Sequence, residues 1–113
     1  MLPKKYRLNK RGSFTYVYAR GTRINGDKIT LCFIPSSAPS PRIGFSVNNK
    51  IGHAVVRNLV KRRMRAIIAE EIPSLRGCQA VFIARKGVDE LSFDRLRAAM
   101  KNCLDKSGLV KQS

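Results

Sequence analysis

Acidic residues are scarce in this sequence, and the scarcity is concentrated in its first 69 residues. Seven Asp and Glu stand against 23 Lys and Arg, so the formal net charge is +16. Residues 1–69 contain fifteen Lys and Arg and a single acid, Asp27, which leaves a net charge of +14. Residues 70–113 contain eight basic and six acidic residues, a net charge of +2. A charge of this size opposes compaction and is tolerated most often where a polyanion neutralises it, so residues 1–69 predict a nucleic-acid partner.

The residues that usually build catalytic and metal sites are also scarce. Histidine occurs once, as His53, near the start of a predicted helix, where a solvated or capping role is commoner than catalysis. The carboxylate pairs Glu70–Glu71 and Asp89–Glu90 are adjacent, and neighbouring side chains on a helix diverge, which argues against an acid–base pair. We therefore predict no catalytic residue and no metal site on this chain. The three cysteines have neither zinc-ligand nor redox spacing, so we expect reduced thiols at Cys32, Cys78 and Cys103.

Long hydrophobic runs are missing as well. No apolar segment approaches the roughly 20 residues that a membrane-spanning helix needs. The opening MLPKKYRLNK lacks the apolar core of a signal peptide, so we expect none. Together with the cysteine pattern, this predicts a cytoplasmic protein. A basic helix lying on a membrane surface is an alternative, although the basic helix predicted below has no aromatic anchors on its apolar side.

Hydrophobic periodicity predicts one α/β domain spanning residues 1–113. Alternation indicates strands at KITLCFI (28–34) and RIGFSVN (42–48), and CQAVFIA (78–84) has the composition of a buried strand. Apolar residues at helical spacing indicate helices at 10–20, 53–71 and 92–106; Pro73 stops the second and Ser92 caps the third. Because helices must cover a sheet, we expect an α+β two-layer sandwich in the order α-β-β-α-β-α, with a possible short strand at 22–25. We expect residues 1–8 to form an extended basic arm and residues 107–113 a flexible tail.

The predicted helix 53–71 separates its side chains into two sides. With 100° between successive residues, an apolar side forms from Val56, Leu59, Val60 and Ile67, and it should pack on the sheet. Arg63 falls among these residues, and we expect it to reach out at the edge of the packing. The opposite side carries Arg57, Asn58, Lys61, Arg62 and Arg65.

A solvated surface is the simplest interpretation of a basic helix side. Solvated helices normally mix charges, with Glu placed four residues from Lys, whereas no acid occurs from Lys28 to Ala69. Arg57, Lys61 and Arg65 follow at one-turn spacing and repel one another without a partner. We therefore favour a polyanion-binding surface, because the planar Arg side chain can donate paired hydrogen bonds to a phosphate.

The predicted strands present a second candidate surface. One face of each strand has the composition of a core: Ile29, Leu31 and Phe33 on the first, and Ile43, Phe45 and Val47 on the second. The opposite faces carry residues that are small or mildly polar: Thr30 and Cys32, and Gly44 and Ser46. Phe14 and Tyr18 lie one helical turn apart beside them. A groove of this kind suits single-stranded nucleic acid, because bases stack on aromatic rings without sequence preference. The alternative, which helical spacing alone favours, is that both rings form the core side of the first helix. The candidate groove residues are Phe14, Tyr18, Thr30, Cys32 and Ser46.

The stretch NNKIGHAVVRNLVKRRMR (48–65) resembles the signature of the bacterial ribonuclease P protein subunit, K-x-G-x-A-V-x-R-N-R-x-K-R-x-x-R. Features around it also fit the family: Arg7–Leu8, Phe14 with Tyr18, RIGFSV before the signature and VFIARKG after it. The resemblance therefore covers about residues 6–104. The matching signature residues are Lys50, Gly52, Ala54, Val55, Arg57, Asn58, Lys61, Arg62 and Arg65.

Three positions depart from the family pattern. Leu59 stands where the family usually has a second Arg, and Arg63 stands where an apolar residue is usual. Cys32 occupies a strand position where some members carry an aromatic residue in the groove. Leu59 cannot make the contact of that Arg, and Cys32 weakens stacking at its position.

The resemblance implies a fold and a function. The basic helix is expected to lie in a left-handed crossover between parallel strands, against the usual right-handed rule. Family members join a large catalytic RNA, and together they remove the 5′ leader from precursor tRNA, leaving a 5′-phosphate on the mature end. The RNA, with Mg²⁺ held mainly by RNA and substrate, is expected to perform the chemistry with metal-activated water. The protein is expected to bind the leader in its groove and the RNA through Arg57, Asn58, Lys61, Arg62 and Arg65, with Lys50 in the preceding turn.

Three other classes of protein compete with this interpretation. A non-catalytic, ribosomal-type RNA-binding protein can have the same composition, and dependence on a catalytic RNA would distinguish the two. A DNA-binding protein that inserts helix 53–71 into a major groove would need a preceding partner helix, whereas this helix follows a strand and a Gly turn. A stand-alone nuclease would need an acid cluster or a histidine pair, and neither pattern is present. No membrane and no small-molecule substrate are implied.

Overall fold

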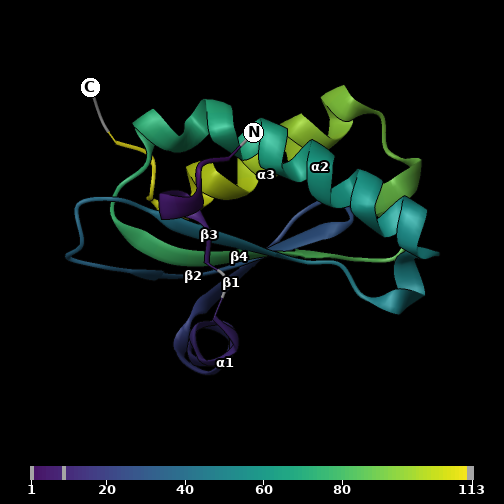
Figure 1. Ribbon diagram of the computed structural model, residues 1–113. Helices are drawn as coiled ribbons and strands as arrows, with labels where there is room; N and C mark the ends of the chain where they lie inside the picture. Colours follow the sequence, from purple (N-terminus) through teal and green to yellow (C-terminus); the bar gives the residue numbers. More distant parts are fainter. Residues whose placement is uncertain (1, 9, 112–113) are drawn as a thin grey trace.

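The computed structural model describes residues 2–8 and 10–111, and its elements follow the predicted order (Figure 1). The α-helices are α1 (Arg11–Arg20), α2 (Ala54–Glu71) and α3 (Phe93–Ser107). The strands are β1 (Thr22–Asn25), β2 (Ile29–Pro35), β3 (Arg42–Ser46) and β4 (Cys78–Ala84), so the short strand expected at 22–25 is present. None of the helices in the described ranges is long and apolar enough to span a membrane.

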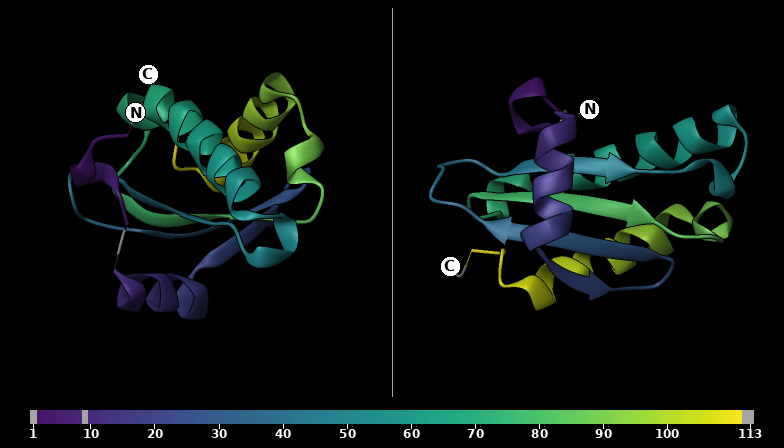
Figure 2. Two further views of the ribbon diagram at one scale, coloured as in Figure 1. Left: turned by 45° about the vertical axis from the view of Figure 1, so that its right-hand side comes forward. Right: turned by 90° about the horizontal axis from the view of Figure 1, so that it is seen from below.

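The helices lie on both faces of the sheet. α2 and α3 cover one face and form the two layers expected from the sequence, while α1 crosses the opposite face, over the strands (Figures 1 and 2). α1 packs mainly on β2 and β4, the two central strands. The face on which we expected an open groove is therefore partly covered by α1.

The sheet has the strand order β1-β2-β4-β3. β2 pairs antiparallel with β1 and with β4, whereas β3 and β4 are parallel neighbours. α2 connects this parallel pair, and the right-hand panel of Figure 2 shows that the crossover is left-handed. The crossover implied by the family resemblance is therefore present, although the general rule for parallel strands favours the opposite hand.

Strand alternation places the main core as predicted. Ile29, Leu31 and Phe33 point toward α2 and α3, and Phe82 of β4 is fully buried beside them. The residues between them on β2 and β4 point to the other face, where a smaller cluster is covered by α1. This second cluster contains Leu8, Val17, Cys32 and Val81.

α2 packs on the sheet with one side, but that side differs in part from the prediction. Leu59, which we expected in the core, is 39% exposed, and that expectation was wrong. The packing side is rotated by about 60° relative to the predicted one, because it includes Met64 and Ile68 as well as Val60 and Ile67. The buried residues of α2 are Val60, Met64, Ile67 and Ile68.

Both described ends of the chain are attached to the domain. Leu2 is fully buried in the main core, and the Leu8 N–H donates to the carbonyl of Ile43 at 2.9 Å, so residues 2–8 are not a free arm. At the other end, the Arg76 N–H donates to the carbonyl of Leu109 at 2.7 Å, and Leu109 is buried. The expected tail is therefore attached as far as residue 111, and residues 112–113 lie outside the described residues.

Phe82→Ala should remove much of the stability of the domain. The Phe82 ring is fully buried and stacks against Phe45 with 6.4 Å between ring centroids. Truncating a buried Phe costs roughly 3–5 kcal/mol, so we expect the free energy of unfolding in urea, followed by circular dichroism, to fall by about that amount. Val55→Ala is the control, because Val55 is 81% exposed, and it should change the free energy by less than roughly 0.5 kcal/mol. Equal losses in the two variants would contradict this core.

Candidate nucleic-acid interface

α2 presents a row of cations on its outer side. Arg57, Lys61 and Arg65 follow one another at one-turn spacing and are half-buried, so their aliphatic stems lie along the protein surface. Asn58 and Arg62 are exposed beside them. The helix therefore brings together all five positions that the sequence predicted on this side. We call these five residues the α2 cationic surface.

No carboxylate within the described ranges lies within ion-pair distance of the α2 cationic surface. Asp27 in the β1–β2 turn and Glu70 and Glu71 at the end of α2 pair with cations of α3 instead, at distances of 3.2 to 3.6 Å, and every partner except Glu71 is well exposed. Such pairs contribute little stability, and on α2 they involve only the last residues of the helix, so they do not neutralise the α2 cationic surface. The pairs are Asp27–Arg95, Glu70–Arg97 and Glu71–Lys101.

The turn before α2 is held by its own hydrogen bonds. Lys50 is exposed on a short 3₁₀ turn, and the side chain of Asn48 accepts a hydrogen bond from the Lys50 N–H at 2.9 Å. The Arg57 guanidinium donates to the carbonyl of Gly52 at 2.9 Å. These contacts order the entry to the helix and place Lys50 before the start of the α2 cationic surface.

Arg63 lies away from that surface. Its guanidinium donates to the carbonyl of Leu91 at 3.5 Å, at the edge where α2 meets the segment before α3. The expectation that Arg63 reaches out at the edge of the packing is therefore confirmed. Leu59 is exposed instead of buried, so α2 presents an aliphatic side chain to solvent at this position.

Two hollows lie along the α2 cationic surface. One, of about 470 Å³, is lined by residues of α2 alone, from Asn58 to Ala66. The other, of about 310 Å³, lies at the edge of β3 and combines cations from α2 with residues of the N-terminal segment and of α1. We call this second one the edge hollow. It is lined by Lys4, Arg7, Leu8, Phe14, Ile43, Phe45, Lys61 and Arg65.

α1 divides the second face of the sheet. The strand register aligns Gly44, Val81 and Cys32 across β3, β4 and β2, and this row lies beneath α1. The next row is partly open. Ser46 and Ile83 in this row are half-buried and Asn25 is exposed. Thr30 is buried, and its hydroxyl donates to the side-chain oxygen of Asn25 at 2.9 Å, so the prediction that Thr30 is an accessible groove contact was wrong. We call this row the sheet strip: Ser46, Ile83, Thr30 and Asn25.

Phe14 and Tyr18 lie on the side of α1 that faces the sheet, and both rings are half-buried. The rings meet edge to face with 6.2 Å between centroids. Phe14 approaches the sheet closely, because a Cβ at Gly44 would lie 2.5 Å from its ring, so a larger residue there would displace the ring. The Arg23 guanidinium lies 5.8 Å from the centroid of Tyr18. The rings therefore pack on the smaller core cluster, as the core interpretation predicts, and remain partly accessible, which leaves room for the stacking that the groove interpretation proposes.

Cys32 does not belong to the accessible surface. Its side chain is fully buried beneath α1, and its thiol donates to the carbonyl of Val17 at 3.2 Å. Alternation placed Cys32 correctly on this face of β2, but the sequence contained no signal that α1 would cover it. Burial raises the pKa of the Cys32 thiol, and the charge of Arg23 offsets part of that increase. A ligand on this face could reach Cys32 only if α1 moved, so we remove it from the candidate contacts.

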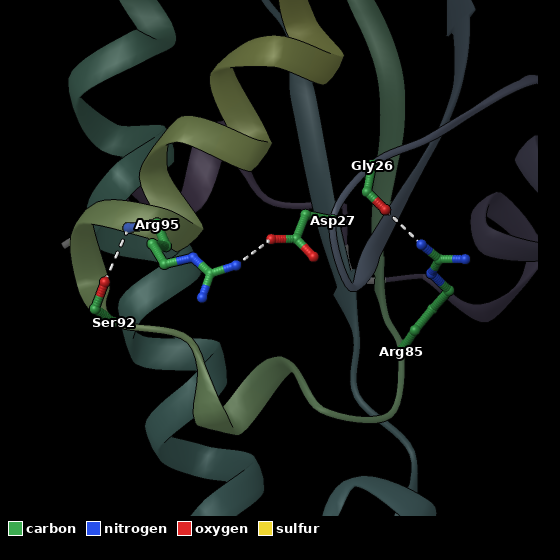
Figure 3. Close-up of polar contacts among 5 residues, drawn as sticks. All are labelled: Gly26, Asp27, Arg85, Ser92 and Arg95. Carbon is green, nitrogen blue, oxygen red and sulfur yellow. Dashed lines mark hydrogen bonds and ion pairs between the residues drawn. The ribbon is translucent and has the colours of Figure 1, made fainter.

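The β1–β2 turn, at one end of the sheet strip, is held by two arginines (Figure 3). Arg85, directly after β4, donates to the carbonyl of Gly26. Arg95 on α3 pairs with Asp27 at 3.2 Å, and its N–H donates to the Ser92 side chain at the helix start. Asp27, the only acid among residues 1–69, is thus engaged in fixing the turn.

Sequence reasoning missed several of these positions. Arg23 and Asn25 share the face of Cys32 and Thr30 through the β1–β2 register, and alternation in β1 could have indicated this. Lys4 and Arg7 were assigned to a free arm, and no local pattern shows that they meet α2 at the edge hollow. Their docking depends on the burial of Leu2, a contact with residues distant in sequence.

Together, the sheet with its left-handed crossover, the unneutralised cations of α2 and the aromatic rings beside the sheet strip define a basic nucleic-acid-binding domain of the α/β class. Comparison with known proteins makes this more specific. The family model for ribonuclease P matches residues 2–108. The chain belongs to the ribonuclease P protein family.

Relatives and solved structures agree with this assignment. The ribonuclease P protein component of Streptococcus agalactiae serotype III is 32% identical over 109 residues, covering 96% of this chain and 100% of the relative. That of Bacillus velezensis is 35% identical over 113 residues, covering 99% and 97%. Among structures, the Thermotoga maritima RNase P protein superposes with a TM-score of 0.81 at 27% identity, over 88% of this chain and 96% of that one. The Staphylococcus aureus RNase P protein gives a TM-score of 0.87 at 21% identity, over 94% and 98%, and thus shares the fold.

Ser46→Cys tests whether the sheet strip is open. Burial raises the pKa of the Cys78 thiol to about 11 and also raises the pKa values of Cys32 and Cys103, so few native thiolates exist at pH 8. We expect the folded wild-type chain to react slowly with a maleimide, and the variant to gain one rapidly reacting thiol, both followed by mass spectrometry. In urea all cysteines should react. Rapid native labelling at position 32 would contradict the position of α1.

Proposed function

We propose that this protein subunit of ribonuclease P positions RNA with two surfaces. The α2 cationic surface, with Lys50, binds the catalytic RNA. Phe14, Tyr18 and the accessible part of the sheet strip, with Ser46, receive the 5′ leader of precursor tRNA; Thr30, predicted as a groove contact, is only 5% exposed and supports the strip from within. The observation that supports this best is the α2 cationic surface, which among the described residues has no acidic partner.

The charge arrangement suits a phosphodiester backbone. Arg57, Lys61 and Arg65 repel one another at one-turn spacing, and this repulsion is relieved when phosphates lie between them. Each neutralised phosphate releases counterions, so binding should weaken steeply with salt, with log K falling by about 0.7 per single-strand phosphate contacted, per decade of salt.

The leader surface suits single-stranded RNA of varied sequence. Half-buried rings are held in place by packing yet leave part of their faces accessible, and a base stacked on such a ring contributes roughly 1–3 kcal/mol. Small polar residues on the sheet strip leave room for a strand. Arg23 beside Tyr18 adds a cation at this surface.

We place the bond cleavage on the RNA component, with Mg²⁺ held mainly by that RNA and the substrate. The donor set of this chain does not suit a protein-held Mg²⁺, because nowhere in residues 2–8 and 10–111 do three His, Cys, Asp or Glu come together. The role of the chain is therefore to bind, orient and concentrate the two RNAs. We place this activity in the cytoplasm, where reduced thiols at Cys32, Cys78 and Cys103 persist.

The direct test is cleavage of 5′-labelled precursor tRNA at low Mg²⁺ by a bacterial ribonuclease P RNA, with and without this protein. We expect correct 5′ cleavage to rise when the protein is added, and the protein alone to cut nothing. No rise with RNAs from several sources would instead support the alternative of a ribosomal-type RNA-binding protein.

Lys61→Gln with Arg62→Gln should reduce this stimulation. A hydrogen bond to a charged group contributes about 1.5–3 kcal/mol, so losing one or two should weaken binding to the catalytic RNA roughly tenfold or more. The matched control is Lys106→Gln with Lys111→Gln, which removes the same charge from exposed positions at the C-terminal end of the described chain. Circular dichroism should show both double variants folded. A normal rate for the α2 variant at low Mg²⁺ would exclude α2 as the RNA-binding element.

Phe14→Leu should separate the two roles of its ring. Leucine keeps apolar volume over the smaller core cluster but cannot stack on a base. We expect affinity for precursor tRNA in the complex to fall by about 1–3 kcal/mol, with affinity for mature tRNA unchanged, both measured by equilibrium binding. An equal loss for the two substrates would assign Phe14 to the core alone.

A further inference from the structure

A second hollow continues the edge hollow on the α1 side of the sheet. It has a volume of about 230 Å³ and shares Arg7 and Leu8 with the edge hollow. Its other walls come from the start of α1 and from the first residues of β3 and β4. We call it the α1 hollow. It is lined by Arg7, Leu8, Lys10, Ser13, Arg42 and Gln79.

Arg7, between the two hollows, is held in place by the fold. Its backbone bridges to Ile43 on the edge of β3, and the next N–H, of Leu8, donates to the Ile43 carbonyl at 2.9 Å. Its Nε donates to the carbonyl of Leu2 at 2.9 Å, and Leu2 is fully buried. Within the described residues, the two terminal amino groups of Arg7 make no hydrogen bond, so they can serve a ligand. A cation fixed in this way loses little conformational entropy on binding.

The α1 hollow has the chemistry of a phosphate site. Lys10 and Arg42 are exposed cations, and the Ser13 hydroxyl and the Gln79 amide can donate hydrogen bonds. No acidic side chain among the described residues lines either hollow. Asp27, the only acid among residues 1–69, is paired with Arg95 on α3.

We infer that the edge hollow and the α1 hollow form one cationic path around the edge of β3, and that it binds the phosphodiester backbone of a strand of the catalytic RNA. The path begins at Lys61 and Arg65, which belong to the α2 cationic surface, passes Lys4 and Arg7, and ends at Lys10 and Arg42. Continuity with α2 is the reason to assign it to the catalytic RNA and not to the leader. The inference rests on the proposed function, because it extends the RNA contact of α2 to the opposite face of the sheet.

The test is Lys10→Gln with Arg42→Gln, measured as equilibrium binding to the ribonuclease P RNA alone over a range of salt concentrations. Two lost phosphate contacts should make the slope of log K against log salt less negative by about 1.4, at about 0.7 per contact. Lys106→Gln with Lys111→Gln removes the same charge at exposed positions outside the path and should leave the slope unchanged. Thermal melting and circular dichroism establish that both variants are folded.

The possible results distinguish a failure of the proposed path from a failure of the proposed function. If the Lys10–Arg42 variant has the slope of the control, the path ends at α2 and the inference is overturned, while cleavage stimulation by the wild type still supports the function. If its loss appears only when leader-bearing precursor is present, the strand is the leader and the assignment to the catalytic RNA is wrong. If inorganic phosphate, at constant ionic strength, weakens RNA binding by the wild type but not by the variant, the phosphate competes with the RNA backbone at these two residues, which supports the inference.

Discussion

The apolar contact between α2 and the sheet is the interaction on which the rest of this protein depends. Four side chains of α2 are buried in the main core, and burying each contributes roughly 1.5–3 kcal/mol. Repulsion between like charges at one-turn spacing costs only about 0.2–0.5 kcal/mol per pair, and the row of Arg57, Lys61 and Arg65 contains two such pairs. Burial therefore exceeds repulsion, and the core can hold in place a row of cations that an isolated helix would disfavour. Because the burial of α2 side chains offsets the repulsion between these cations before any ligand binds, the row is preorganised for phosphates.

The position of α1 determines which residues on the second face of the sheet are accessible to a ligand. α1 crosses the face of the sheet opposite α2, so the Phe14 ring lies over Gly44, and α1 buries Cys32 beneath it. This arrangement joins packing and binding in the same residues. Phe14 and Tyr18 are held by the smaller core cluster, which limits their motion, and they leave part of each ring accessible. Rigid aromatic surfaces of this kind stack bases at low entropic cost.

The edge of β3 shows how the fold manages an exposed strand. β3 is an edge strand, and unpaired edges invite association with other chains. Part of this edge is covered by the segment containing Arg7 and Leu8, which is anchored in turn by Leu2 in the main core. The cover is basic, so the same segment that protects the edge also adds cations between the two faces of the sheet.

The sequence by itself determined the helices and strands, the core faces of β2 and β3, the charge of α2 and the family signature. These features follow from local periodicity and composition, which neighbouring residues carry without help from the rest of the chain. The exposure of Leu59, the burial of Cys32 and the docking of Leu2 were decided only by tertiary structure. Helical spacing gives the direction of each side chain around the helix axis, but it does not show which direction faces the sheet. Alternation assigns each residue to a face of the strand, but it does not show which element covers that face. The hollows at the β3 edge likewise depend on residues brought together from distant parts of the sequence, and only packing of the whole chain sets that proximity.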